Sequence, residues 1–203
     1  MSAADTPFAG RPVADVSKPT LRAPILTRRR SLPAADRDRA DRALAAVAAS
    51  VAAGAPAGPV CAYAPMAGEP GGAALLPALL ATGREVLVPV LRPDRDLDWT
   101  RADPAHAPGA RLTEPVGPRL GPSAVAAAAV VFVPALAVDR QGVRLGRGGG
   151  SYDRALTRVP AGTPVVALLY DGEMVAELPS EPHDRPVTAV IDPSGIHPCP
   201  CRG

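Results

Sequence analysis

The chain has 203 residues, of which 47% are hydrophobic and 21% charged, with a formal net charge of +2 at pH 7. This length fits one domain with a substantial core, and that core must be built from Ala, Val and Leu because only 3% of the residues are aromatic. The near balance of charge argues against a nucleic-acid-binding protein or a membrane-surface protein.

The cysteines and the hydrophobic runs indicate the compartment. Cys61 lies in an apolar run that predicts a buried strand, whereas Cys199 and Cys201 lie in a Pro-rich terminal segment. Three cysteines in these contexts do not predict a disulfide framework. No apolar run reaches the roughly 18 residues that span a bilayer, and the N-terminal segment lacks the apolar stretch of a signal peptide. We therefore expect a cytoplasmic protein.

The ends of the chain differ from its middle. Residues 1–16 predict a disordered extension and residues 197–203 a flexible tail, so that 17–196 form one folded domain. Ser31 is expected to cap a helix that begins near Pro33 and stops near Gly54. Apolar residues recur every three or four positions along one face of this helix, as Ala40, Leu44, Val47 and Val51.

After this helix, short apolar runs alternate with helical segments. Strands are predicted at 60–64, 85–90, 130–134, 165–170 and 188–192, and helices at 73–82 and 151–158. This alternation is typical of a parallel sheet that is covered on both faces. We therefore predict an α/β fold, a single domain with a mostly parallel sheet flanked by helices on both faces. Residues 92–122 are expected to form a long loop, and loops of this length are often functional.

A glycine-rich segment joins the predicted strand at 130–134 to the predicted helix at 151–158. Glycines lack side chains where a backbone must pack close to a ligand; those concerned are Gly146, Gly148, Gly149 and Gly150. The free N–H groups of the helix start attract anions, and the forked guanidinium groups of Arg144 and Arg147 suit phosphate oxygens. Asp153 is placed to hold a magnesium ion that also contacts the phosphates.

The residues alone leave a second interpretation open. The segment lacks the G-K-[ST] ending of a P-loop, and no G-x-G-x-x-G register fits. A flexible loop in which Asp153 only stabilises the helix N-terminus is the alternative. Spacing by itself favours neither interpretation.

The whole segment, VPALAVDRQGVRLGRGGGSYDR, closely resembles the one that identifies 5-formyltetrahydrofolate cyclo-ligases, whose pattern is approximately P-G-x-x-F-D-x-x-G-x-R-L-G-x-G-x-G-Y-Y-D. The residues in register are Pro134, Asp139, Gly142, Arg144, Leu145, Gly146, Gly148, Gly150, Tyr152 and Asp153. So many matches in one register are much more specific than a lone glycine motif.

Three weaker segments agree in order and spacing. Residues 18–22 resemble the family's K-x-x-L-R, residues 63–69 its strand and loop ending in a substrate-contacting Glu, and residues 178–184 its late L-P-x-x-x-x-D. The resemblance extends from about Lys18 to Ile196, which is nearly the whole predicted domain.

The resemblance implies an enzyme that uses ATP and Mg²⁺ to convert 5-formyltetrahydrofolate to 5,10-methenyltetrahydrofolate. It implies ATP-binding residues at Lys18, Arg22, Arg144, Leu145, Gly146, Arg147, Gly148, Gly149, Gly150, Ser151 and Tyr152. It implies substrate contacts at Glu69, Ala64, Arg147, Gly148, Gly149, Gly150 and Ser151. The implied catalytic residues are Arg147, Arg144 and Lys18, and the implied metal ligands are Asp153 and Asp184. We expect a monomer that acts on a small molecule, without a nucleic-acid or membrane partner.

Taken singly, several of these residues have simpler interpretations. Lys18 is the only lysine among 22 basic residues, which favours a need for a compact charge, but a solvated charge at a helix start is the alternative. Glu69 alternatively stabilises the first turn of the next helix. Asp184 by itself is an ordinary acidic residue in a Pro-rich loop, and Tyr63 fits a core strand position better than a ligand contact.

The chain departs from the family pattern at several positions. Ser151 replaces the first Tyr of G-Y-Y-D, which removes an aromatic wall and is expected to weaken folate stacking. Gly149 stands where many members carry a larger residue, and Ala137 and Val138 replace the usual aromatic residue before the aspartate. Pro24 falls within the first helix and is expected to kink it.

Two other functions remain as alternatives. The first is a non-catalytic folate- or nucleotide-binding relative with the same fold. The second is an RNA-binding protein that uses its arginines and the RGGG run, against which the near-neutral charge and the scarcity of aromatic residues argue.

Overall fold

The computed structural model describes residues 17–103, 117–182 and 184–200, and the predicted extension at 1–16 lies outside these ranges. Its helices are α1 (Lys18–Ser31), α2 (Ala34–Gly54), α3 (Leu75–Leu80) and α4 (Ser151–Leu156), with short 3₁₀ turns η3 (Gly72–Ala74) and η4 (Pro122–Ala127). The strands of the main sheet are β1 (Val60–Ala62), β2 (Val86–Leu91), β3 (Leu97–Arg101), β4 (Val130–Pro134), β7 (Val165–Leu168), β9 (Ala189–Asp192) and β10 (Gly195–Pro198). A smaller sheet contains β5 (Ala137–Asp139), β6 (Arg144–Leu145) and β8 (Met174–Val175).

The main sheet confirms the predicted fold class. Within the described residues, its strand order is β10-β9-β7-β4-β1-β2-β3. The strands from β2 across to β9 pair in parallel, and only the edge strands β3 and β10 pair antiparallel. From the centre, β1 leads to β2 on one side and β4 leads to β7 and β9 on the other. The order therefore reverses between β1 and β4, which is where ligands bind in open α/β sheets, beyond the carboxyl ends of the strands.

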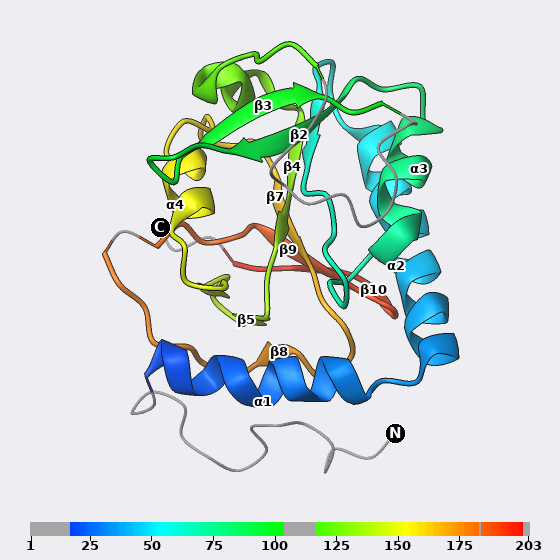
Figure 1. Ribbon diagram of the computed structural model, residues 1–203, viewed down its shortest axis with the longest axis vertical. Coiled ribbons are helices and arrows are strands. Elements are labelled where there is room, and N and C mark those ends of the chain that lie inside the picture. Colours follow the sequence, from blue (N-terminus) through cyan, green and yellow to red (C-terminus); the bar gives the residue numbers. More distant parts are fainter. Residues whose placement is uncertain (1–16, 104–116, 183, 201–203) are drawn as a thin grey trace.

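Helices cover both faces of this sheet (Figure 1). On one face, α2 and α3 pack through Leu44, Leu75 and Leu79 against β1 and β4. On the other face, α4 packs through Ala155 and Leu156 together with η4. Alternate residues of each central strand point into the two cores, as expected for buried strands.

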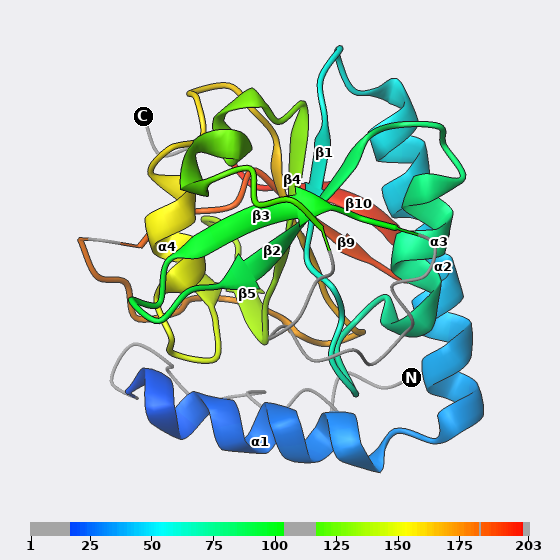
Figure 2. The same ribbon diagram turned by 45° about the horizontal axis from the view of Figure 1, so that its top comes forward.

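Helix α1 lies apart from these two layers, along one end of the molecule (Figures 1 and 2). Leu21 and Ile25 on one side of α1 pack on Leu136 and Leu145 of the small-sheet region. The helix is continuous through Pro24. This packing places Arg22 beside the segment that follows β6, and Lys18 beside Glu181 and Asp184.

The structure corrects the expected loop at 92–122, because residues 97–101 form β3, paired antiparallel with β2. Leu97 and Trp99 point into the core, whereas Asp98 is only half-buried. This alternation is the signature of a strand, but charged residues on both sides of the segment obscure it. Residues 104–116 lie outside the described ranges.

Two expected boundaries also differ. Ser31 does not cap α2: it is the last residue of α1, and its hydroxyl bonds to Arg28 O at 2.9 Å. The predicted flexible tail begins too early, because His197 and Pro198 belong to β10 and the N–H of the buried Cys199 donates to Thr188 O at 2.9 Å. Backbone pairing with the sheet therefore orders a segment whose composition resembles a loose tail.

No helix in the described parts of the chain combines the length and apolar character that crossing a membrane requires.

Candidate active site

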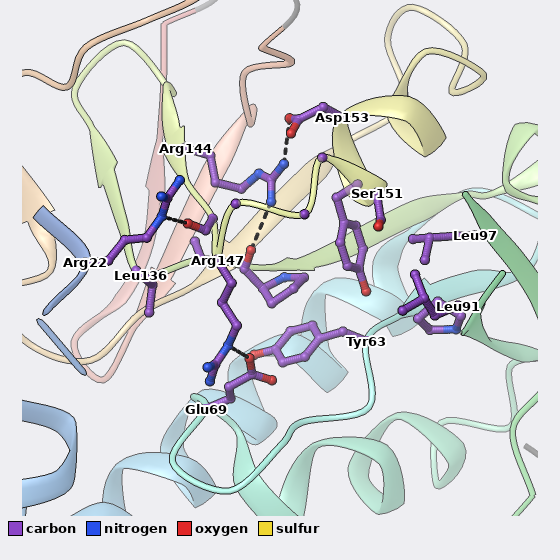
Figure 3. A pocket seen from close by; sticks show the side chains of 18 of the residues that line it. Arg22, Tyr63, Glu69, Leu91, Leu97, Leu136, Arg144, Arg147, Ser151 and Asp153 are labelled. Carbon is purple, nitrogen blue, oxygen red and sulfur yellow. Dashed lines mark hydrogen bonds and ion pairs between the residues drawn. The ribbon is translucent and has the colours of Figure 1, made fainter. Parts of the chain in front are cut away.

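A cavity of about 380 Å³ opens at the point where the strand order reverses. Tyr63 and Ala64, directly after β1, form part of its wall, and Pro134 and Ala135 at the end of β4 form another part. Its volume lies within the range of small-molecule sites. The close-up in Figure 3 shows side chains from three parts of the chain around this cavity. They come from the glycine-rich segment after β6, from the loop after β1, and from the hairpin formed by β2 and β3.

The cavity collects the site residues that the sequence predicted, with one exception. The residues that line it include Lys18, Arg22, Ala64, Glu69, Arg144, Gly146, Arg147, Gly148, Gly149, Gly150, Ser151, Tyr152, Asp153 and Asp184. Leu145 is the exception, because its side chain is buried in the core against α1. Any contact of Leu145 with a ligand would have to come from its backbone. The separate functions of these residues stay predictions.

Two motif residues shape the chain rather than face the cavity. Asp139 is fully buried, and its carboxylate accepts backbone N–H groups from Gln141, Val143 and Leu178 at 2.8–3.1 Å. Gly142 has a φ of +81°, and a Cβ there would clash with Val187 O. Together they force the tight turn between β5 and β6, which aims the glycine-rich segment at the cavity.

Arg22 holds the glycine-rich segment from the side of α1. Its Nε donates to Gly146 O at 2.9 Å. Gly148 has a φ of +99°, and a Cβ there would lie 3.1 Å from Arg22 Cζ. The positive φ favours glycine at this position, and the absence of a side chain lets the loop lie directly against the guanidinium.

Three ion pairs lie at the wall of the cavity, and each joins a predicted phosphate-binding cation to a predicted ligand carboxylate. The Nζ of Lys18 lies 2.7 Å from Asp184 Oδ2, and Arg144 Nη2 lies 2.7 Å from Asp153 Oδ1. Arg147 Nε donates to Glu69 Oε1 at 2.9 Å (Figure 3). The charges of the site are thus largely neutralised within the protein, so that ligands must exchange partners with these pairs.

The aromatic residue of the segment presents a polar group as well as a ring. The Tyr152 hydroxyl is buried and has no hydrogen-bond partner among the described residues. Burial, reinforced by the negative charge of Glu69, raises the pKa of Tyr152 well above its usual value. The guanidinium of Arg144 lies over its ring, 5.7 Å from the centroid. Tyr152 therefore stays protonated, with a buried hydroxyl whose hydrogen no described residue accepts.

The donor set fits a magnesium ion held in the manner typical of phosphate chemistry. Mg²⁺ is usually bound through one or two carboxylates, with substrate phosphates and water completing the shell. Asp153 and Asp184 both line the cavity. Elsewhere in the described ranges, no cluster of three or more His, Cys, Asp or Glu side chains offers a site made of protein alone.

One wall of the cavity was not anticipated. The β2–β3 hairpin contributes Pro89, Leu91 and Leu97, and Leu136 adds a further apolar side chain from β4's end. Leu91 is exposed, so the hairpin offers apolar surface beside the charged loop (Figure 3). The alternation in residues 97–101 was the signal that could have revealed this wall.

The buried cysteine Cys61 takes no part in the chemistry. Burial raises the pKa of the Cys61 thiol to about 12, so this cysteine is no nucleophile.

Fold and site together define a small α/β enzyme that combines an arginine- and glycine-rich anion site with an apolar wall in one cavity. Residues 14–193 match the 5-formyltetrahydrofolate cyclo-ligase family. The chain therefore belongs to this family of ligases, which confirms the resemblance.

Individual relatives agree over most of the chain. A 5-formyltetrahydrofolate cyclo-ligase of Mycolicibacterium smegmatis is 42% identical over 184 residues, covering 87% of this chain and 94% of the relative. That of Escherichia coli is 42% identical over 62 residues, or 30% of this chain and 34% of the relative. The 5,10-methenyltetrahydrofolate synthetase of Aquifex aeolicus superposes with a TM-score of 0.69 at 29% identity, covering 92% and 95% of the two chains. That of Mycoplasma pneumoniae has a TM-score of 0.67 at 17% identity, covering 87% and 99%, and shows the shared fold.

Proposed function

We propose that this protein converts 5-formyltetrahydrofolate to 5,10-methenyltetrahydrofolate with ATP and Mg²⁺, releasing ADP and phosphate, as a cytoplasmic monomer in one-carbon metabolism. The observation that carries the proposal is the meeting of the glycine-rich loop, Arg147 and Glu69 in one cavity. Family membership and the name of the 42% identical relative support the same reaction.

The chemistry explains why a nucleotide is needed. Ring closure requires N10 of the folate to attack the formyl carbon on N5 and to expel the formyl oxygen. An amide oxygen is a poor leaving group, but it leaves readily as phosphate once it has accepted the γ-phosphoryl group of ATP. N10 loses its proton, and the methenyl bridge then joins N5 and N10. Such a transfer depends on in-line positioning and on charge neutralisation rather than on a protein nucleophile.

The basic residues of the cavity supply that neutralisation. Arg144, Arg147 and Lys18 would contact the phosphates, with backbone N–H groups of the glycine-rich loop between them. Asp153 and Asp184 would hold Mg²⁺, which neutralises phosphate charge when bound. Because each of these carboxylates is paired with a cation in the structure, the phosphates and the metal would replace the partners that the pairs lose.

Glu69 would fix the folate. Its carboxylate is almost fully buried at the cavity wall, and its oxygens are suited to accept the adjacent N–H donors of a pterin ring. The apolar side chains of the β2–β3 hairpin would pack on the rest of the aromatic system. This orientation would bring the formyl oxygen towards the glycine-rich loop.

A spectroscopic assay tests the proposal. Purified protein, 5-formyltetrahydrofolate and MgCl₂ are mixed, and the near-ultraviolet absorbance of the methenyl product is followed with and without ATP. Product that forms only with ATP is the expected result. Nucleotide binding without product would instead support the non-catalytic relative, with Ser151 as the first position to restore to Tyr.

A further inference from the structure

Glu69 lies in a turn between β1 and η3, not in a helix or strand. Within the turn, the N–H of Glu69 donates to Met66 O and the N–H of Met66 donates to Glu69 Oε2, both at 2.9 Å, and the Tyr63 hydroxyl donates to Pro70 O. A further set of buried polar contacts reaches the turn from outside the cavity. The central member of the set is Asp41 on α2, a residue that does not line the cavity.

Asp41 contacts the turn directly. Its Oδ1 accepts the N–H of Gly71 at 2.9 Å and the hydroxyl of Tyr170 at 2.8 Å. The Tyr170 hydroxyl also lies 3.3 Å from Glu69 O, so its single hydrogen is shared between the two acceptors. A Cβ on Gly72 would clash with the Asp41 carboxylate, which shows how closely the turn packs on this side chain.

The far side of Tyr170 is fixed as well. Its backbone N–H donates to Glu173 Oε2 at 2.9 Å, and Glu173 forms a buried ion pair with Arg29 of α1 at 2.7 Å. The guanidinium of Arg29 also lies 5.5 Å from the Tyr170 ring centroid. A continuous polar chain thus runs from α1 through Tyr170 to Asp41 and the Glu69 turn.

A carboxylate at this place has a cost that packing does not explain. Asp41 is only 6% exposed and lies on the face of α2 that otherwise carries Leu44, Ala45 and Ala48. Burying a carboxylate is unfavourable unless it accepts hydrogen bonds. One of its two donors, the Gly71 N–H, belongs to the Glu69 turn, and the other, the Tyr170 hydroxyl, also contacts Glu69 O. The buried carboxylate therefore fixes the geometry of that turn.

We propose that Asp41 is a positioning residue for the folate: it holds the 69–71 turn so that the Glu69 carboxylate faces the cavity. This inference rests on the proposed function, in which Glu69 binds the pterin. It predicts a larger effect on folate than on ATP, because Asp41 itself contacts neither the glycine-rich loop nor the residues expected to bind ATP, and Glu69 reaches them only through its ion pair with Arg147.

The test compares Asp41→Ala with Asp41→Asn, which keeps the accepting Oδ1. We expect Asp41→Ala to raise KM for 5-formyltetrahydrofolate about tenfold or more, in line with the loss of hydrogen bonds to a charged acceptor, and to change KM for ATP by a clearly smaller factor. Asp41→Asn should recover most of the folate affinity. Thr188→Val is the matched control. It also removes two hydrogen bonds, those that the Thr188 hydroxyl makes with the backbone of Val165 at the start of β7.

Several results would overturn the inference. They are an unchanged folate KM in folded Asp41→Ala, an equal rise of both KM values, or an equal rise of folate KM in Thr188→Val. If Asp41→Ala does not fold, the same KM values are measured in Tyr170→Phe, which removes the shared hydroxyl and leaves the Asp41–Gly71 bond. An unchanged folate KM in that variant would then overturn the inference. Wild-type protein that neither binds nor converts 5-formyltetrahydrofolate would overturn the proposed function and this inference together, whereas active wild type with unaffected variants would overturn the inference alone.

Discussion

Arg147 and Glu69 form an ion pair at the wall of the cavity. Arg147 Nε donates to Glu69 Oε1 at 2.9 Å, and the N–H of Met66 donates to Glu69 Oε2 at the same distance. The Glu69 side chain is 6% exposed, whereas that of Arg147 is 45% exposed. The arginine is therefore the partner with room to move, and a pterin that needs both carboxylate oxygens must displace it.

We expect nucleotide and folate to bind cooperatively for this reason. Phosphates that attract Arg147 would free Glu69, so a non-hydrolysable ATP analogue with Mg²⁺ should tighten folate binding by about 5- to 150-fold, the usual range of coupling between sites. Isothermal titration with and without the analogue measures the effect. In Arg147→Ala, folate should bind no more weakly than in wild type without nucleotide, and the coupling should disappear. Coupling that survives in this variant would contradict the exchange.

Removal of Arg147 should also slow the chemistry. Loss of one oriented donor to a developing charge lowers kcat by about 10²–10³-fold, and Arg147→Lys should recover only part, because it keeps the charge without the fork. Steady-state turnover at saturating substrates provides the measurement. Arg140→Ala is the matched control, since Arg140 is exposed in the β5–β6 turn and does not line the cavity. Wild-type kcat in Arg147→Ala would remove this arginine from the mechanism.

Asp153→Asn tests the metal assignment. The Asp153 carboxylate should contribute to Mg²⁺ binding once Arg144 leaves it to pair with the phosphates. The variant should therefore need about 10- to 100-fold more Mg²⁺ for half-maximal rate. The readout is a Mg²⁺ titration of turnover at fixed ATP. Asp171→Asn, at an exposed position outside the cavity, serves as the control. An unchanged titration would return Asp153 to a role at the helix start.

The Arg29–Glu173 pair should be important for stability. Both side chains are almost fully buried, and burial raises the pKa of Glu173 despite the opposing effect of Arg29. Glu173→Ala leaves the guanidinium buried without its counter-charge, so the free energy of unfolding should fall by about 3–5 kcal/mol. Urea denaturation measures this change. The double change Arg29→Met with Glu173→Leu should lie closer to wild type, and a double variant as unstable as the single one would show that the charges themselves are required.

Asp96 should contribute to acid sensitivity. Partial burial works against its ionisation, but hydrogen bonds from Arg158 and from the Leu97 N–H outweigh this and lower the pKa of Asp96 below its usual 3.8. A lowered carboxyl pKa stabilises the fold above about pH 4, and this stability is lost as the pH falls through the lowered pKa. Asp96→Asn should therefore be less stable than wild type at pH 7, by about 1 kcal/mol for a pair that keeps some contact with solvent. Unfolding midpoints of the two proteins are measured at pH 7 and at pH 3. The difference between wild type and Asp96→Asn should be smaller at pH 3 than at pH 7.

Much of this protein was predictable from the sequence because the controlling interactions are local. Buried parallel strands produce apolar runs wherever they occur, so the central strands and the two-faced architecture followed from pattern alone. The turn between β5 and β6 needs a residue such as Asp139 to accept neighbouring N–H groups and a glycine at 142 for its positive φ. These requirements lie within a few residues of each other, and they leave a recognisable motif.

The pairing of charges was decided only by the tertiary structure. Lys18 meets Asp184 across 166 positions, and Arg147 meets Glu69 across 78. Nothing local distinguishes Asp41 from the other acidic residues of α2, although it alone among them is buried beneath the Glu69 turn. Which distant segments meet at the reversal of strand order depends on the packing of the whole sheet. That packing, rather than any local motif, determines which carboxylate each cation neutralises before a ligand arrives.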